Sequence, residues 1–256
     1  MLTAMTEAAQ ALPLARFVED VRALAPVDGH VRHEWLPDGR TSLVFRVFDD
    51  GRRGDVSLAG PRTRARIKDL SGVARAVVVK FKPGWAVPCF GVAANEVTDR
   101  IVPLEAIWGR DGADLYGRLV ETEDVTEWLD CVSGAITQRA RRVFESSSAH
   151  LARRAARLLE DGEARIERVA AQLGVTDRHL RRAFTEHIGV GPKEYARSVR
   201  LQRALRLATT SSDWCRIALD AGYYDQAHFI TDFRQLVGVT PGAFARSARE
   251  ADLWCD

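Results

Sequence analysis

An internal repeat in the second half of the chain constrains its fold more than any other feature. The stretch AAQLGVTDRHLRRAFTEHIGVGPKEY, from Ala170 to Tyr195, is echoed by AGYYDQAHFITDFRQLVGVTPGAF, from Ala221 to Phe244. Gly174 and Gly222 lie 48 residues apart. Later positions match at an offset of 49: Leu180 with Phe229, Phe184 with Phe233, Gly189 with Gly238, Pro192 with Pro241 and Tyr195 with Phe244. Such a repeat means that one supersecondary unit occurs twice.

Each copy has the pattern of a short helix, a glycine-containing turn and a second helix. Gly174 and Gly222 can adopt the positive φ that ends the first helix. Thr176 and Asp225 are suited to cap the second helix. The pattern predicts two helix-turn-helix units, in which the second helix of a unit enters the DNA major groove. The predicted units are 166–187 and 214–236.

The second helix of the first unit, TDRHLRRAFTEH, is rich in arginine. Because Leu180 and Phe184 face the core at a spacing of four residues, Arg178, Arg181 and Arg182 are left pointing outward. An arginine in this place can pair with guanine O6 and N7 or bind a phosphate. The alternative is a plain helical hairpin in a bundle, and the combination of two copies with this arginine-rich face favours DNA binding over it.

The segment between the two units, PKEYARSVRLQRALRLA, is expected to form a linker helix over 192–208. Basic residues are concentrated around it. From 139 to 206 the chain has 16 Lys and Arg against 8 Asp and Glu, although the net charge of the whole chain is only +2. A basic block of this kind is either a polyanion-binding surface or a solvated helix face.

With these motifs in place, Ala164 to Arg246 resembles the DNA-binding domain of the AraC/XylS family of bacterial transcription regulators. The matching text is IERVAAQLGV, LRRAF and GVGPKEYARSVRLQRALRLA, followed by IALDAGYYDQAHFITDFRQLVGVTPGAF. The resemblance implies two helix-turn-helix subdomains that bind two adjacent major grooves of double-stranded promoter DNA as a unit. It also implies contact with RNA polymerase, with activation of transcription as the commoner mode.

The resemblance further assigns DNA-contacting positions. The base-reading positions are Arg178, Arg181 and Arg182 in the first recognition helix and Gln226, Ala227, Ile230 and Thr231 in the second. The predicted interface also contains His179 (as a positioning or surface residue), Lys193, Arg197 and Arg234.

One departure from the family pattern lies in the second recognition helix. Many members have arginine where this chain has Thr231, and Asp232 adds a negative charge beside it. From 207 to 256 there are 4 Lys and Arg against 7 Asp and Glu. We therefore expect the first helix to supply most of the affinity and sequence reading, with Gln226 and Arg234 as weaker contacts.

The N-terminal half has a different texture, with roughly 110 residues of short strands separated by Gly, Pro and Asp turns. One such turn is Pro37–Gly39 and another is Asp50-Gly51. The predicted fold class is α+β: a small antiparallel β-sheet or barrel-like N-terminal domain with helices, followed by an all-α double helix-turn-helix domain. The predicted boundaries are 1–143 for the first domain, 144–150 (FESSSAH) for a linker and 151–248 for the DNA-binding domain.

Through EWLPDGRTSLVFRV, VVVKFKPG and GVAANEVTDRIVPLEAIWG, the N-terminal half resembles a domain found on a subset of AraC-like regulators. The resemblance implies that it senses a small-molecule effector or makes homodimer contacts. Its aromatic residues either line a cavity or form ordinary core: Trp35, Phe45, Phe81, Trp85, Phe90 and Trp108. An apolar stripe faces its own domain or a second copy: Trp128, Leu129, Val132 and Ile136.

Several polar residues of this half are assigned to other roles. His30 and His33 have no carboxylate nearby at metal-like spacing, so we predict no metal site. Asp38 and Arg40 flank a turn and are assigned to turn chemistry. The four cysteines are far apart and include no CxxC pair, which argues against structural zinc. We expect no cofactor.

Two alternatives remain to be weighed. Repair proteins can combine this kind of DNA-binding module with alkyl transfer to a cysteine, which would make Cys89 an alkylation-repair or alkylation-sensing nucleophile. A reactive thiol needs a base or cation nearby, and no His follows Cys89 directly, so we predict no catalytic residues. An interaction protein that has lost DNA binding is the other alternative, and the basic block argues against it.

The first residues lack the basic leader and the apolar run of a signal peptide. No apolar run approaches the ~20 residues of a membrane-spanning helix. We expect a cytoplasmic, nucleoid-associated protein without membrane contact.

Overall fold

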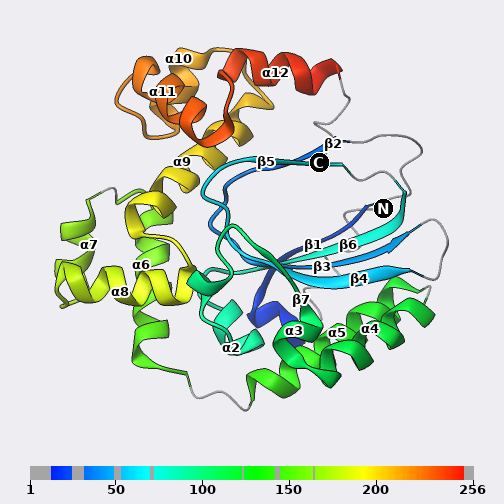
Figure 1. Cartoon of the computed structure of the whole chain (residues 1–256). Coiled ribbons are helices and arrows are strands. Elements are labelled where there is room, and N and C mark those ends of the chain that lie inside the picture. The colour runs from blue at the N-terminus through cyan, green and yellow to red at the C-terminus, as the bar shows by residue number, and fades with distance from the viewer. Residues whose placement is uncertain are drawn as a thin grey trace.

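The computed structural model describes residues 13–24, 32–48, 53–69, 72–122, 124–141, 145–163 and 165–250. Strands are confined to the N-terminal half of the chain, whereas the C-terminal half is built from helices (Figure 1). The predicted α+β class, with an antiparallel sheet before an all-α domain, is confirmed. The turn predicted at Asp50-Gly51, His30 and residue 144 lie outside the described residues.

A five-stranded antiparallel sheet forms the centre of the N-terminal half. Its strands run in the order β1 (Val18–Leu24), β6 (Val73–Phe81), β3 (Ser42–Phe48), β4 (Gly54–Ala59) and β7 (Ile101–Pro103). Phe45 is paired with Val56 on one side and with Val77 on the other. A separate two-stranded ribbon pairs β2 (Arg32–Trp35) with β5 (Arg66–Asp69).

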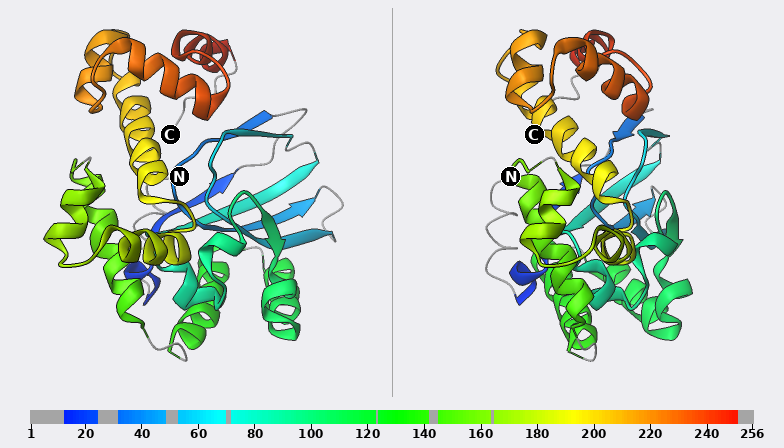
Figure 2. Two further views of the ribbon diagram at one scale, coloured as in Figure 1. Left: turned by 60° about the vertical axis from the view of Figure 1, so that its left-hand side comes forward. Right: turned by 90° about the vertical axis from the view of Figure 1, so that its left-hand side faces the viewer.

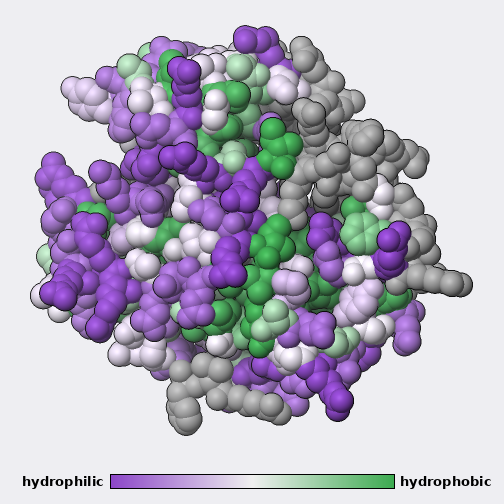
Figure 3. All heavy atoms as spheres, viewed as in Figure 1, coloured by the Kyte–Doolittle hydropathy of each residue, from purple (hydrophilic) through white to green (hydrophobic). Residues whose placement is uncertain are grey.

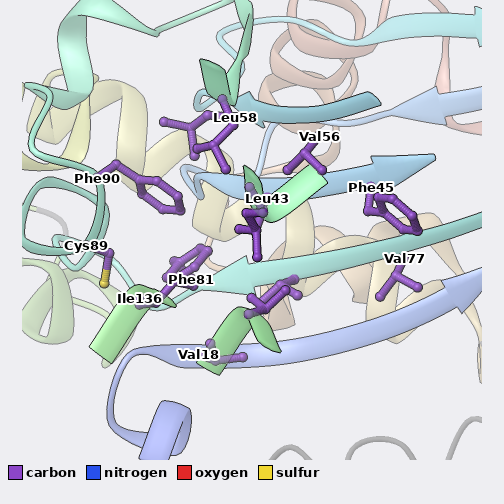
Figure 4. Close-up of a cluster of buried hydrophobic side chains, with 14 of the residues drawn as sticks. Val18, Leu43, Phe45, Val56, Leu58, Val77, Phe81, Cys89, Phe90 and Ile136 are labelled. Carbon is purple, nitrogen blue, oxygen red and sulfur yellow. The ribbon is translucent and has the colours of Figure 1, made fainter. Parts of the chain in front are cut away.

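One face of the sheet carries the main hydrophobic core. Alternate residues of β3 enter it, namely Leu43, Phe45 and Val47, because side chains of a strand point to opposite faces with a period of two. Figure 4 shows Leu43 and Phe45 among side chains from the neighbouring strands and from the helices. The helices that cover this face are α2 (Ala86–Phe90), α3 (Leu104–Trp108), α4 (Arg110–Glu121) and α5 (Val125–Ala140) (Figure 1).

The same core decides two alternatives left open by the sequence. The apolar stripe of α5 packs inside it, so that stripe faces its own domain. Of the aromatic residues, Phe45, Phe81, Phe90 and Trp108 belong to the core and Trp85 packs against it. Ordinary packing therefore accounts for these five aromatic side chains. Short 3-10 turns, η1 (Pro13–Arg16) and η2 (Ala94–Glu96), complete this half.

The linker predicted over 144–150 is corrected by the structure. Helix α6 (Ser147–Glu160) already includes 147–150. The hydroxyl of Ser146 accepts a hydrogen bond from the backbone N–H of Ala149 at 3.1 Å, so these serines begin a helix.

The remaining helices form two groups joined by one long helix (Figure 2). On one side lie α6, α7 (Ile166–Gln172) and α8 (Asp177–Ile188), and on the other lie α10 (Trp214–Asp220), α11 (Gln226–Val237) and α12 (Pro241–Glu250). Helix α9 (Pro192–Ala208) runs between the groups. Among the described helices, none is both long enough and apolar enough to cross a membrane.

The two halves of the chain are packed against each other along a boundary that we call the seam. On the N-terminal side it includes 36–40, 60–66, Gly84, Trp85 and Thr98. Thr98 donates to the carbonyl of Gly189 after α8 at 2.6 Å, and Gln202 of α9 donates to the carbonyl of Pro37 at 2.8 Å. The backbone N–H of Ala65 donates to the carbonyl of Leu236 near the end of α11 at 2.7 Å. The sheet domain therefore contacts both helix-turn-helix units.

Candidate nucleic-acid interface

The turns of the two predicted helix-turn-helix units have the same backbone structure. Gly174 and Gly222 both have positive φ, 68° and 91°. The N–H of Val175 returns to the carbonyl of Ala170 at 3.0 Å, and the N–H of Tyr223 returns to the carbonyl of Ala218 at 2.9 Å. These bonds satisfy carbonyls that the end of a helix leaves open, so glycine sets the angle between the helices in both units.

The starts of α8 and α11 are capped as the sequence predicted. The hydroxyl of Thr176 accepts from the N–H of His179 at 3.2 Å, and a carboxylate oxygen of Asp225 accepts from the N–H of His228 at 2.7 Å. A side-chain cap of this kind stabilises a helix by about 0.5–2 kcal/mol. Both recognition helices thus begin at fixed residues directly after their turns.

Equivalent aromatic pairs hold the two recognition helices in place. Phe184 meets Tyr195 edge to face at 5.3 Å between ring centroids, and Phe233 meets Phe244 in the same way at 5.6 Å. Both pairs are related by the offset of 49 residues that the sequence shows. The repeat therefore extends from the sequence pattern to the packing of the core.

The outward face of α8 is cationic. Arg178, Arg181 and Arg182 are exposed, as is His179. Arg181 is paired with Asp177 at 2.8 Å, and this hydrogen bond raises the pKa of Arg181. Arg178 and Arg182 form no hydrogen bond or ion pair with the part of the chain that the structure describes. Figure 3 shows hydrophilic side chains gathered over α7 and α8.

The outward face of α11 is nearly neutral. Gln226, Ala227, Thr231 and Arg234 are exposed, whereas Ile230 is half-buried and packs against the core of the second unit. Lys193 is exposed in the first turn of α9. The predicted contact residues of the second unit thus include one exposed arginine.

Asp232 and Arg197 have contacts that the sequence did not predict. Asp232 is buried and pairs with Nε of Arg197 at 2.6 Å, so its charge does not lie beside Thr231 on the outer face. Arg197 also donates to the side chain of Gln235 at 2.8 Å. Its guanidinium joins α9 to α11 in this arrangement, and its place among the DNA contacts stays a prediction. Sequence spacing did not show this pair, because its partners lie 35 residues apart.

Comparison with known proteins agrees with this geometry. Residues 169–247 match a family model described as a helix-turn-helix domain, and residues 7–103 match a domain of unknown function, DUF6597. A curated relative, the HTH-type transcriptional regulator GlxA of Rhizobium meliloti (strain 1021), is 40% identical over 74 residues. That match covers 28% of this chain and 23% of the relative. Residues 169–247 therefore form a helix-turn-helix domain of the AraC type.

Two solved structures are among those that are similar to this chain. The C-terminal domain of AraT, a response regulator from Geobacillus stearothermophilus, is 25% identical, with a TM-score of 0.38 over 40% of this chain and 88% of that one. ToxT from Vibrio cholerae is 14% identical, with a TM-score of 0.47 over 89% of this chain and 97% of that one.

Outside the helix-turn-helix domain, the structure argues against the chemistry considered for Cys89. The thiol is fully buried, and burial raises its pKa to about 12, although Arg16 acts in the opposite direction. A nucleophilic cysteine needs a lowered pKa and access to its substrate. Within the described ranges, no three His, Cys, Asp or Glu side chains cluster as metal ligands would.

Sequence reasoning missed two residues. Tyr224 is 87% exposed directly before the cap of α11 and adds an aromatic side chain to the outer face. Arg40 makes the predicted turn contacts, since its backbone N–H donates to Oδ1 of Asp38 at 2.9 Å and its guanidinium donates to the carbonyl of Asp38 at 3.2 Å. The same guanidinium also reaches Glu160 of α6 and Tyr195 of α9 at the seam. For Tyr224, the only signal in the sequence was its place in a turn, at a position that does not pack into the core. No local signal showed that Arg40 would reach the helical domain.

Proposed function

We propose that this protein is a sequence-specific DNA-binding transcription regulator whose helix α8 makes the principal base and phosphate contacts. The observation that carries the proposal is the pair of unengaged, exposed arginines on α8, Arg178 and Arg182, on a helix whose angle is set by the turn at Gly174. An arginine that pairs with guanine discriminates by about 1–3 kcal/mol. Phosphate contacts by the same face would add affinity that falls with salt.

Binding across two adjacent major grooves is supported by the linker helix. Helix α9 has 17 residues, which corresponds to about 25 Å at a rise of ~1.5 Å per residue. Successive major grooves are about 34 Å apart, so two recognition helices carried beyond the ends of α9 are suitably spaced.

Helix α11 is proposed as the weaker contact. Because Asp232 is held inside by Arg197, the outer face does not repel phosphates through that carboxylate. Gln226 and Arg234 remain as its polar contacts. The expectation that α8 dominates therefore rests on the scarcity of cations on α11 and no longer on the acidity of Asp232.

A gel-shift comparison tests this proposal. Bound sites are first selected from random DNA with the whole chain, and the selected probe is then titrated with Arg182→Ala, Thr231→Ala and the control Arg110→Ala. Arg110 is exposed on α4 in the N-terminal half. We expect Arg182→Ala to weaken binding by roughly 5- to 150-fold, from the ~1–3 kcal/mol of one arginine contact, and the control to leave it unchanged.

The same titration contains the result that would refute the proposal. If Thr231→Ala weakens binding as much as Arg182→Ala, α8 is not the dominant reader. If no sequence is enriched and binding does not fall with salt, the protein is an interaction module and not a regulator that reads DNA. If the slope of the logarithm of the binding constant against the logarithm of the salt concentration is smaller by ~1 in Arg182→Ala, that arginine contacts a phosphate.

Activation, an effector in the N-terminal domain, a homodimer and contact with RNA polymerase remain predictions from the family resemblance. The domain boundaries 1–143 and 151–248 are likewise predictions. Transcription in vitro from a promoter with the selected site, with and without the protein, decides the direction of regulation.

A further inference from the structure

Arg62 is a buried cation that has no hydrogen-bonded acidic partner among the residues that the structure describes. It lies in the loop between β4 and β5, and only 2% of its surface is exposed. Its Nε and Nη1 atoms have no hydrogen-bond partner in the described part of the structure. The guanidinium carbon stands 4.8 Å from the centroid of the Trp35 ring. A buried charge without hydrogen bonds is strongly unfavourable, so this arrangement calls for an explanation.

Asp99, the acidic group that acts electrostatically on Arg62, does not supply the missing partner. Both carboxylate oxygens of Asp99 are engaged by Thr63, one by its N–H at 3.0 Å and the other by its hydroxyl at 2.6 Å. Burial lowers the pKa of Arg62, the neighbouring Arg66 lowers it further, and Asp99 only opposes these effects. Asp99 is thus engaged by Thr63, and Nε and Nη1 of Arg62 are left without a partner among the described residues.

The loop that carries Arg62 contacts both helix-turn-helix units. Pro61 packs so closely against Gly189, which follows α8, that a Cβ added to this glycine would lie 2.5 Å from the Pro61 ring. On the other side, the N–H of Ala65 donates to the carbonyl of Leu236 in α11. Any group that binds at Arg62 would therefore act at the point where the sheet domain holds the two units.

We propose that Arg62 is the cationic end of a binding site for a small oxyanion, a carboxylate or a phosphate, at the seam. The anion would accept a hydrogen bond from one of the two unsatisfied guanidinium nitrogens, Nε or Nη1, with Arg66 as a second cation and the Trp35 ring as an apolar wall. Hydrogen bonds to charged groups are stronger in a low-dielectric site. Because the guanidinium is almost inaccessible in this structure, the anion reaches it only when the seam opens.

Binding can be measured without DNA by thermal unfolding of the whole chain. Sodium phosphate and sodium benzoate are added separately to a chloride buffer of constant ionic strength, so that the two arms distinguish phosphate from carboxylate ligands. The variants are Arg62→Met and the matched control Arg64→Met, since Arg64 is exposed in the same loop. We expect the wild type and the control to gain about 3–6 °C in Tm at tenfold the Kd of the effective anion, and the gain should rise with the logarithm of the anion concentration above that point.

Arg62→Met is expected to lose this gain, and without anion to melt no lower than the wild type, because it removes an uncompensated buried charge. Where Arg62→Met does not fold, Arg62→Lys takes its place and should bind the anion more weakly than the wild type. The proposal is overturned if neither anion shifts the wild type, or if the shift persists undiminished in the Arg62 variant. The proposed DNA binding is tested separately by the gel shift, so failure of one leaves the other standing.

Discussion

Replacing Arg40 with Met should loosen the attachment of the sheet domain to the helical domain. The Arg40 guanidinium donates to the hydroxyl of Tyr195 at 2.7 Å and to Oε1 of Glu160 at 2.8 Å, and it is also paired with Glu19. The side chain of Arg40 is 12% exposed. Burial by itself lowers the pKa of Arg40, but Tyr195, Glu19 and Glu160 outweigh burial and raise it, so the group stays charged. One side chain thus joins β1, α6 and α9.

The cost of this change follows from the burial of the groups left behind. Removing one partner of a fully buried ion pair costs about 3–5 kcal/mol. Glu19 and Glu160 remain partly in water, whereas the ring of Tyr195 is fully buried. We therefore expect the free energy of unfolding to fall by about 2–3 kcal/mol, below the range for a fully buried pair. For a chain of this size that corresponds to roughly 4–12 °C in Tm.

Urea unfolding measures this effect through two probes. Tryptophan fluorescence reports mainly on the sheet domain, where Trp85, Trp108 and Trp128 lie in or against the core, and far-UV circular dichroism reports mainly on the helices. In Arg40→Met we expect a lower midpoint and transitions that coincide less closely, because the remaining contacts of the seam couple the halves more weakly.

The control for Arg40→Met is Arg216→Met. Arg216 forms an exposed ion pair with Asp220 at 3.6 Å, and such pairs contribute about 0–1 kcal/mol. If Arg40→Met changes the midpoint no more than Arg216→Met does, the seam is not held by this cluster and the reasoning is wrong.

Two further predictions concern the helical domain. Burial lowers the pKa of His187 in the folded protein below its usual 6.5, although Glu186 acts in the opposite direction. The unfolded chain therefore binds the proton more readily than the folded protein. The free energy of unfolding should fall as the pH drops from 6.5 through the lower pKa of the folded state. Urea unfolding between pH 8 and pH 5 should show a smaller loss for His187→Gln than for the wild type, and equal losses would refute this assignment. Arg197→Ala should lower the free energy of unfolding by about 3 kcal/mol, because it leaves Asp232 buried and unpaired, and Arg197→Ala with Asp232→Ala should recover part of it. If Arg197→Ala weakens DNA binding and leaves the urea midpoint unchanged, Arg197 contacts DNA and does not stabilise the fold.

Local features of this protein were open to prediction because their physics is local. A glycine with positive φ such as Gly174, or a cap such as Thr176, acts on residues within a few positions along the chain. The exposed arginines of α8 followed from helical spacing alone, since a residue next to Leu180 cannot share its face. The start of α6 was harder to predict, because the same serines suit both a linker and a helix cap.

The sequence by itself determined the repeat, the two helix-turn-helix units, the cationic face of α8 and the α+β order of the chain. Tertiary structure alone decided which charges are free. Arg197 and Asp232 lie 35 residues apart, and Arg40 and Tyr195 lie 155 residues apart, so no spacing rule connects them. The energy of an ion pair depends on separation in space and on burial. Both arise only after the sheet domain has packed on the helices, which is why Asp232 proved to be internal, Arg40 a residue of the seam and Arg62 a buried cation.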